Sequence, residues 1–264
     1  KVHFKNKDRY HIVFDKTPFY PEGGGQVGDS GLIKTIDKHM DDLKVLDTKK
    51  ENNVIIHVVD SMPNKLPLGE YSLIPDSISR RLISRNHSAT HLLHHVLRQL
   101  LGSHVEQKGS YVGSDYLRFD FSHFEKISFD QLLKIEKQIN HLIINGIAIK
   151  EYRELELQKA KDMGAIALFG EKYGANVRVI QFGNSIELCG GTHVHNTAEI
   201  GLFKIISESS VAAGIRRVEA VTSSGALDFI NTKLSTLLEV QGLLKNSDNV
   251  INSLTKIIHE NNKR

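Results

Sequence analysis

Residues 85–95 read Arg-Asn-His-Ser-Ala-Thr-His-Leu-Leu-His-His and lie in the middle of a predicted helix. Asp76 is a favourable N-cap residue and Gly102 is a common stop signal, so we expect the helix to lie between them. Apolar residues recur along it at helical spacing and form the expected buried stripe: Ile78, Leu82, Ala89, Leu93, Val96 and Leu100. His87 and His91 lie on a different face, one turn apart. Cβ atoms at that spacing are about 5–6 Å apart, so both imidazoles can reach one metal ion.

A second pair of ligand-type residues lies far downstream, where residues 188–193 read Leu-Cys-Gly-Gly-Thr-His. Cys189 is the only cysteine of the chain, and His193 follows it four positions later. The intervening glycines carry no Cβ, so both side chains can turn towards one centre. Each pair alone is a weak signal, because such residues are more often found in cores or on surfaces. Together they predict one site, and a cysteine–histidine ligand set favours zinc over magnesium or calcium. We interpret His94 as a surface or outer-shell residue rather than a ligand.

Residues 1–75 contain short β-branched runs bounded by turn residues, which predict a small antiparallel β-barrel. Between the first two runs, residues 17–31 hold two prolines and five glycines, a composition that excludes a regular element. This Gly-rich loop lacks the Gly-Lys-Ser/Thr of a P-loop. Its glycines are equally typical of a tight barrel corner and of a loop that contacts a ligand.

Hydrophobic patterning over residues 76–223 predicts amphipathic helices among mostly antiparallel strands, which is an α+β domain. A proline and a glycine at 66–69, together with Pro75, mark its boundary with the barrel. Strands are expected at 116–121, 147–152, 177–182, 186–188, 202–206 and 216–222, and a small-residue loop is expected at 207–214. Residues 224–264 carry apolar side chains at helical spacing, interrupted near 246–249, and predict a C-terminal helical arm.

The totals narrow the class of protein. With 264 residues, 40% hydrophobic content and a net charge of +3, the chain is typical of a globular protein and only mildly favours a polyanionic partner. No apolar run approaches the roughly 18 residues of a membrane span, and no signal peptide is recognisable. A single cysteine fits a reducing, cytoplasmic setting. Because the chain opens inside an apparent strand and without Met, we expect it to be part of a longer protein.

Several motifs together resemble the editing region of alanyl-tRNA synthetases. The motifs are Asn-His-Ser-Ala-Thr-His-Leu-Leu at 86–93, Cys-Gly-Gly-Thr-His-Val at 189–194, Pro-Phe-Tyr-Pro-Glu-Gly-Gly-Gly-Gln at 18–26, Gln-Lys-Gly-Ser at 107–110 and Ala-Gly-Ile-Arg-Arg-Val-Glu-Ala at 213–220. They cover nearly the whole chain in the order of that family. Threonyl-tRNA synthetases and freestanding AlaX-type proteins share the two-pair arrangement, but the Cys-Gly-Gly-Thr-His form is similar to the alanyl branch. No segment resembles the class II aminoacylation core, so we expect alanine activation to be absent from this chain.

The resemblance implies hydrolysis of serine or glycine wrongly esterified to the 3′ end of tRNA(Ala). A pocket shaped for alanine cannot fully exclude these amino acids, so a second hydrolytic site is needed. The implied roles are zinc binding by His87, His91, Cys189 and His193, hydrogen bonding to the substrate by Thr90, Gln107 and Ser110, and contacts with tRNA by Arg216, Arg217, Gly23, Gly24 and Gly25. For the substrate residues and the arginines, the alternative is that they are ordinary polar strand or surface residues. For the three glycines, the alternative is a tight barrel corner.

Two other interpretations of the whole chain stay open. One is a freestanding AlaX-type deacylase, and the other is a zinc-stabilised module that binds tRNA without catalysis. Four protein ligands usually make a closed, structural zinc site, whereas catalytic zinc keeps one position for water. The sequence therefore leaves open whether zinc activates water or only orients the substrate.

Overall fold

The computed structural model describes residues 4–6, 9–35, 41–61, 69–167, 173–244 and 249–263. The chain divides into two compact units, Lys1–Ser223 and Ser224–Arg264. The first unit contains three antiparallel sheets together with helices, so the predicted α+β class is confirmed. The finer division of this unit into residues 1–75 and 76–223 stays a prediction, and residues 66–68 of the proposed boundary lie outside the described residues.

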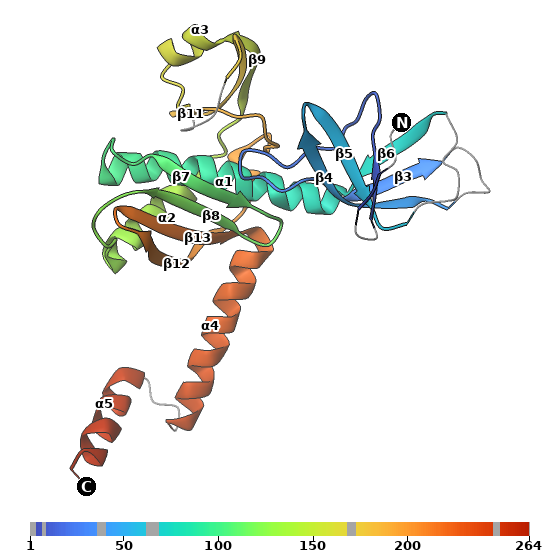
Figure 1. Cartoon of the computed structure of the whole chain (residues 1–264). Coiled ribbons are helices and arrows are strands. Elements are labelled where there is room, and N and C mark those ends of the chain that lie inside the picture. The colour runs from blue at the N-terminus through green and yellow to red at the C-terminus, as the bar shows by residue number, and fades with distance from the viewer. Residues whose placement is uncertain are drawn as a thin grey trace. The chain divides into compact units, whose positions relative to one another are not determined.

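A six-stranded antiparallel sheet forms the N-terminal part of the first unit (Figure 1). Its strands are β1 (Phe4–Asn6), β2 (Arg9–Ile12), β3 (Gly31–Thr35), β4 (Leu43–Glu51), β5 (Val54–Val59) and β6 (Tyr71–Pro75). Neighbouring strands follow the order β1-β2-β5-β4-β3-β6. Among the described residues no ladder joins β1 to β6, so closure into a barrel stays a prediction. A small core fills one face: Ile12, Phe19, Ile33, Leu43, Val45 and Val59.

Helix α1 (Ser77–Leu101) begins and ends where its sequence signals predict. The Asp76 carboxylate accepts hydrogen bonds from two backbone N–H groups of the first turn, and Gly102, with a φ of 121°, ends the helix. The centre of the predicted stripe, including Ala89, is fully buried. Ile78 and Leu100 are 72% and 43% exposed, so the prediction that they are buried is wrong. They lie in the first and last turns of the helix, which extend beyond the packed centre.

Helix α1 packs with α2 (Phe129–Ile144) against a four-stranded sheet of order β12-β13-β8-β7 (Figure 1). The strands are β7 (Gln107–Val112), β8 (Leu117–Ser122), β12 (Phe203–Ala212) and β13 (Ile215–Thr222). The two helices and this sheet enclose the main core, which holds Leu93, Phe119 and Ile139, all 0% exposed. Burial of each such side chain contributes about 1.5–3 kcal/mol, so this core anchors the part of α1 that carries the histidines.

A third sheet, of order β11-β10-β9, carries the Cys-Gly-Gly-Thr-His segment. Its strands are β9 (Lys150–Glu156), β10 (Asn176–Phe182) and β11 (Ser185–Leu188), and it is accompanied by the short helix α3 (Leu157–Asp162). The 3-10 helix η1 (Thr197–Ile200) follows the segment. Cys189 comes directly after β11, so the β10–β11 hairpin determines where the segment leaves the sheet.

The expected loop at 207–214 is mostly strand. β12 continues to Ala212 and pairs along its length with β13, with Ser209 opposite Arg217. Only a tight turn remains, in which Gly214 has a φ of 71°. The backbone partners offered by β13 override the weak strand propensity of the small residues, an effect that local patterns do not reveal. β3 and β6, which the sequence patterns did not indicate, pair with each other.

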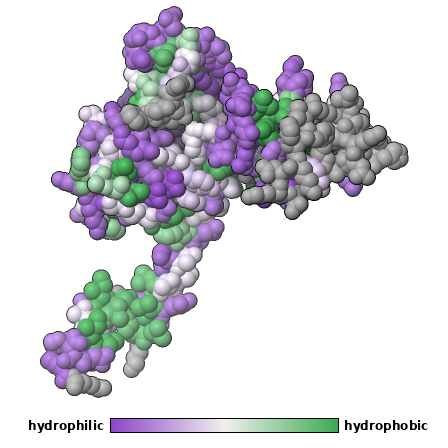
Figure 2. All heavy atoms as spheres, viewed as in Figure 1, coloured by the Kyte–Doolittle hydropathy of each residue, from purple (hydrophilic) through white to green (hydrophobic). Residues whose placement is uncertain are grey.

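The second unit consists of α4 (Ser223–Leu243), except its first residue, and α5 (Val250–Asn261). Hydrophobic residues gather on the exposed surfaces of these helices (Figure 2), among them Leu237, Leu238, Ile257 and Ile258. The helical arm predicted for this part of the chain agrees with these two helices. Residues 246–248 of the expected interruption lie outside the described residues. Within the described ranges, no helix has both the length and the apolar character needed to cross a membrane.

Candidate metal centre

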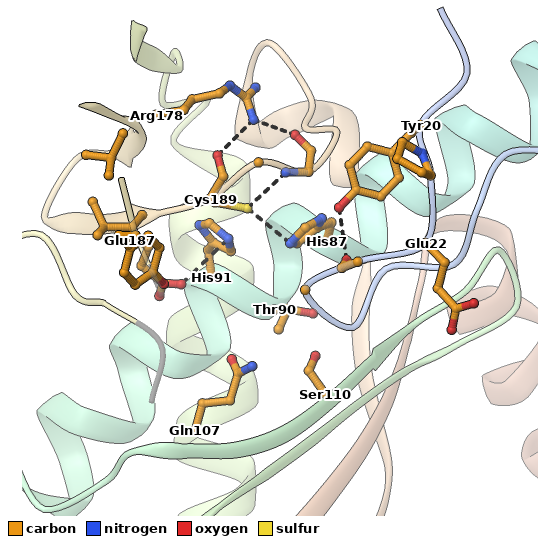
Figure 3. A pocket seen from close by; sticks show the side chains of 18 of the residues that line it. Tyr20, Glu22, His87, Thr90, His91, Gln107, Ser110, Arg178, Glu187 and Cys189 are labelled. Carbon is orange, nitrogen blue, oxygen red and sulfur yellow. Dashed lines mark hydrogen bonds and ion pairs between the residues drawn. The ribbon is translucent and has the colours of Figure 1, made fainter. Parts of the chain in front are cut away.

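Side chains from the two distant stretches meet at one point of the first unit (Figure 3). His87, His91, Cys189 and His193 each offer one ligand-type atom, and these atoms all lie within 4.8 Å of one another. Cys189 Sγ is 3.4 Å from His87 Nε2 and 3.2 Å from His193 Nε2. The pairs that the sequence spacing singled out are therefore brought together, and the cluster could hold a metal ion.

The protonation states of the histidines suit metal binding. Burial lowers the pKa of His87 and of His193 well below the ordinary value, and neighbouring charges, including that of Arg178, lower both further. Burial also lowers the pKa of His91, although the Glu187 carboxylate opposes the shift. Neutral imidazole is the form that binds a metal. His91 Nδ1 is buried without a hydrogen-bond partner among the described residues, which is a costly state that a ligand would relieve. Three imidazoles and one thiolate fit zinc.

Each histidine of the cluster contacts a further polar side chain. His87 Nδ1 lies 2.7 Å from Gln26 Oε1, and His193 Nδ1 lies 3.0 Å from Ser88 Oγ. Glu187 is buried, with its carboxylate 3.6 Å from His91 Nε2. Such outer partners orient metal ligands and select the tautomer of an imidazole. The same carboxylate lies 3.0 Å from Nδ1 of His94, which is buried, so a surface position for His94 is wrong and a supporting role beside the cluster stays a prediction.

A pocket of about 590 Å³ opens beside the cluster. The predicted substrate residues Thr90, Gln107 and Ser110 line it together with Gly23 and Gly24. The Thr90 hydroxyl donates to the carbonyl of Asn86 one turn earlier, which leaves its lone pairs as acceptors. Gly25 packs against Ser110, and a Cβ on Gly25 would come 2.8 Å from that of Ser110. The Gly-rich loop thus forms one wall of the pocket, and the roles of these residues in binding stay predictions.

The paired arginines of β13 lie elsewhere. Arg217 forms a bidentate ion pair with Asp120, with N–O distances of 2.6 and 2.8 Å, and Arg216 forms an ion pair with Glu208. Neither arginine is among the residues that line the pocket. Two other cations do line it, Lys50 and Arg178. A contact of Arg216 or Arg217 with tRNA stays a prediction, and it would have to compete with these ion pairs.

Arg178 holds the cysteine segment in place. Its Nη1 donates to the carbonyl oxygens of Cys189, at 3.0 Å, and Gly191, at 2.6 Å, while its Nε donates to Glu151 at 2.6 Å. Hydrogen bonds from Arg153 and Arg178 hold the pKa of Glu151 at about 2, below its ordinary value of 4.5. The link from β9 through Arg178 therefore stabilises the segment while Glu151 is ionised.

This pairing predicts an acid-dependent contribution to stability. A carboxylate with a depressed pKa in the folded state stabilises the protein fully above its unfolded pKa, and the contribution is lost as the pH falls through the folded pKa. For Glu151 the loss therefore falls between about pH 4.5 and pH 2. We expect the melting temperature of the metal-free chain to exceed that of Glu151→Gln at pH 6, and the difference to shrink towards zero by pH 2. A difference that is constant over this range would contradict the pairing.

Comparisons with known proteins agree with this architecture. Residues 177–219 match the family model described as "Threonyl and Alanyl tRNA synthetase second additional domain". Alanine–tRNA ligases of Flavobacterium psychrophilum and Christiangramia forsetii are each 49% identical to the chain, over 96% and 99% of its length. The ligase of Bacteroides fragilis is 49% identical over 99% of it. The chain belongs to the alanine–tRNA ligase family. It spans about 30% of the length of these curated relatives.

Membership of the alanine–tRNA ligase family confirms the resemblance to the alanyl branch and corrects one expectation. We expected no segment to resemble the class II aminoacylation core, but residues 1–72 match the model described as "tRNA synthetases class II (A)". The absence of alanine activation from this chain stays a prediction. The other match, over 177–219, includes Cys189 and His193 but not His87 and His91, which lie upstream on α1. The cluster in this alanine–tRNA ligase segment is therefore assembled from residues inside and outside the second additional domain.

Sequence reasoning missed several residues of this site in the ligase segment. Gln26 lies within the Gly-rich loop, Arg178 lies between two apolar positions of β10, and Glu187 precedes Cys189 by two residues. One signal did point to Glu187. Side chains alternate along a strand, so Glu187 lies on the same face of β11 as Cys189, and a charged residue there needs a partner. No local pattern singles out Gln26 or Arg178, because their partners lie far away in sequence.

Proposed function

We propose that this segment hydrolyses the ester bond between a wrong amino acid, serine or glycine, and the 3′-terminal adenosine of tRNA(Ala). The position of the cluster carries the proposal: three of its four ligand-type side chains, His87, His91 and Cys189, line an open pocket that Thr90, Gln107 and Ser110 also line. A purely structural metal site would not need such a pocket. The activity serves protein synthesis in the cytoplasm.

The reaction is a simple exchange of bonds. Water adds to the ester carbonyl carbon, and the bond from that carbon to the ribose oxygen breaks. One proton of the water passes to the ribose oxygen, which regains its hydroxyl, and the other is released to solvent as the amino acid leaves with a carboxylate. Gln107 and Ser110 on β7 hydrogen-bond the ester or the seryl hydroxyl from one side, while Thr90 on α1 offers acceptor lone pairs beside the cluster. Lys50 and Arg178 attract the anionic end of the tRNA.

Zinc is the metal that we propose for His87, His91, Cys189 and His193. When bound, it supplies a positive charge that polarises an ester carbonyl or orients the substrate. The Glu187 carboxylate lies near His91, and Gln26 and Ser88 contact the far nitrogens of the other two histidines. The chain's own residues therefore fix the ligand geometry before a metal arrives.

Two alternatives make different predictions. A freestanding AlaX-type deacylase would hydrolyse the same ester, and the ligase relatives favour a ligase segment over it. A zinc-stabilised module without catalysis would bind the acceptor end and leave the ester intact. The pocket beside the cluster favours catalysis, since a binding module needs contacts with phosphates rather than a hollow next to its metal.

The deciding experiment follows the ester bond. Ser-tRNA(Ala), Gly-tRNA(Ala) and Ala-tRNA(Ala) are incubated with the purified chain, with and without a chelator, and intact aminoacyl-tRNA is measured over time. We expect Ser- and Gly-tRNA(Ala) to be deacylated faster than their spontaneous hydrolysis, Ala-tRNA(Ala) to be spared, and added zinc to restore activity after chelation. Intact ester in every sample, with tRNA still bound in a gel shift, would instead support the binding module.

A further inference from the structure

Gln26 joins the Gly-rich loop to both halves of the metal centre. Its side chain is 0% exposed although it comes from a loop. Oε1 lies 2.7 Å from His87 Nδ1 and also accepts a hydrogen bond of 2.9 Å from the backbone N–H of Thr192. Nε2 donates to the Thr192 hydroxyl at 3.1 Å. One amide therefore contacts both His87 on α1 and the segment that carries Cys189 and His193.

These contacts determine the tautomer of His87. The backbone N–H of Thr192 can only donate, so the amide atom that faces it must be the oxygen of Gln26 rather than the nitrogen. The same oxygen faces His87 Nδ1 and can only accept, so Nδ1 must carry the hydrogen. Nε2 of His87 then holds the lone pair, and Nε2 is the atom that faces Cys189 Sγ.

Ser88, the partner of His193, does not decide a tautomer in this way. Ser88 Oγ accepts from the backbone N–H of Val194, at 3.1 Å, and its hydroxyl can either donate to His193 Nδ1 or accept from it. The Gln26 amide cannot exchange its donor and acceptor in this way, because its oxygen must face the N–H of Thr192. Backbone hydrogen bonds also hold the loop around Gln26. Gly23 and Gln26 bond each other, at 3.0 and 3.1 Å, and Val27 bonds Val112 of β7 at 3.1 Å.

We propose that Gln26 is a positioning residue of the metal centre, which presents Nε2 of His87 to the metal and holds the Cys-Gly-Gly-Thr-His segment at the distance where Cys189 can share that metal. The loop between β2 and β3 thus contributes directly to a site whose ligands all come from residues 87–193. This inference concerns metal binding, so it can be tested whether or not the chain deacylates tRNA.

Two substitutions distinguish the effect of the hydrogen-bond acceptor of Gln26 from the effect of the size of its side chain. Gln26→Met keeps the length but cannot accept strong hydrogen bonds, so His87 loses its fixed tautomer and a buried N–H of Thr192 loses its partner. Removal of such an outer partner typically lowers metal affinity by about 10–100-fold, and we expect that loss for Gln26→Met. Gln26→Glu keeps an oxygen that accepts both bonds, and we expect its zinc affinity to stay within about threefold of the original or to rise.

The measurement is the zinc dissociation constant of the purified full chain in competition with a chromophoric chelator. Absorption of the cobalt-substituted chain serves as a second readout, since its thiolate-to-cobalt band reports whether Cys189 coordinates the metal. The matched control is Thr48→Val. Thr48 is also 0% exposed and hydrogen-bonded, to the carbonyl of Asp29 in the same N-terminal part, but it does not contact the cluster. We expect Thr48→Val to leave the zinc affinity unchanged.

A direct readout needs no substitution. Long-range ¹H–¹⁵N spectra of the metal-free chain distinguish protonated from unprotonated imidazole nitrogens, and we expect Nδ1 of His87 to be protonated and Nε2 to be unprotonated. The opposite tautomer would overturn the inference even if Gln26→Met fails to fold. Unchanged zinc affinity in folded Gln26→Met, or equal losses in the Met and Glu variants, would also overturn it.

Discussion

Cys189→Ala is expected to abolish deacylation of Ser-tRNA(Ala) and to lower zinc affinity by more than about 100-fold, since loss of an outer partner alone costs about 10–100-fold. Cys189 supplies the only sulfur of the cluster and lies within 3.4 Å of ligand nitrogens of both His87 and His193. Its thiolate is the ligand that offsets part of the metal's charge. Without it, three neutral imidazoles remain, and these bind zinc more weakly.

The side chain of Cys189 is only partly buried, so we expect the metal-free variant to melt close to the metal-free original chain. Gly190→Ala is the matched control on the same segment, because a Cβ at Gly190 would meet no atom within 4 Å. Zinc content, the melting temperature and the rate of ester loss are measured on all three proteins. Hydrolysis by Cys189→Ala at the original rate would refute a role for the cluster in the reaction.

Gly191→Ala is expected to disrupt the metal centre although it adds a single methyl group. A Cβ at Gly191 would overlap the His87 ring and lie 2.7 Å from Gln26 Oε1. Overpacking of this kind typically costs about 1–3 kcal/mol, and here the strain falls on a ligand and on the side chain that orients it. Neither Gly190 nor Gly191 has a φ in the left-handed region, so space alone separates the two positions.

The two glycine variants therefore form a direct comparison. We expect Gly191→Ala to melt several degrees lower, to bind zinc at least about tenfold more weakly and to lose deacylation in proportion, since displaced ligands cost affinity. Gly190→Ala should behave like the original chain. Equal effects of the two substitutions, measured by thermal unfolding and zinc competition, would contradict the packing around His87.

How far the sequence predicted the structure depended on the range of the interactions. The limits of α1 were predictable, because Asp76 and Gly102 act on neighbouring backbone groups. The grouping of His87 with Cys189 was predictable from two short spacings and a shared chemistry, although it joins residues 102 positions apart. The extent of β12 could not be predicted, because its pairing with β13 outweighs the weak strand propensity of its serines.

The environment of each site residue was harder to predict. Arg217 looked available for phosphate, but its partner Asp120 lies 97 positions earlier. Gln26 belongs to one of the motifs behind the family resemblance, but its role could not be predicted, because it depends on a contact with His87 that only the folded chain creates. Glu187 could have been suspected from its place near Cys189, but its two histidine partners come from α1. Motif spacing therefore located the cluster, and tertiary contacts determined what surrounds it.

The central claim is that two pairs of residues, far apart in sequence, hold one zinc ion. X-ray absorption at the zinc edge, on the purified chain loaded with one equivalent of zinc, tests this most directly. We predict one sulfur at about 2.3 Å and nitrogen ligands at about 2.0–2.1 Å from the metal. The sulfur should disappear in Cys189→Ala. A spectrum of the original chain without sulfur, or zinc that does not bind in a 1:1 ratio, would contradict the claim.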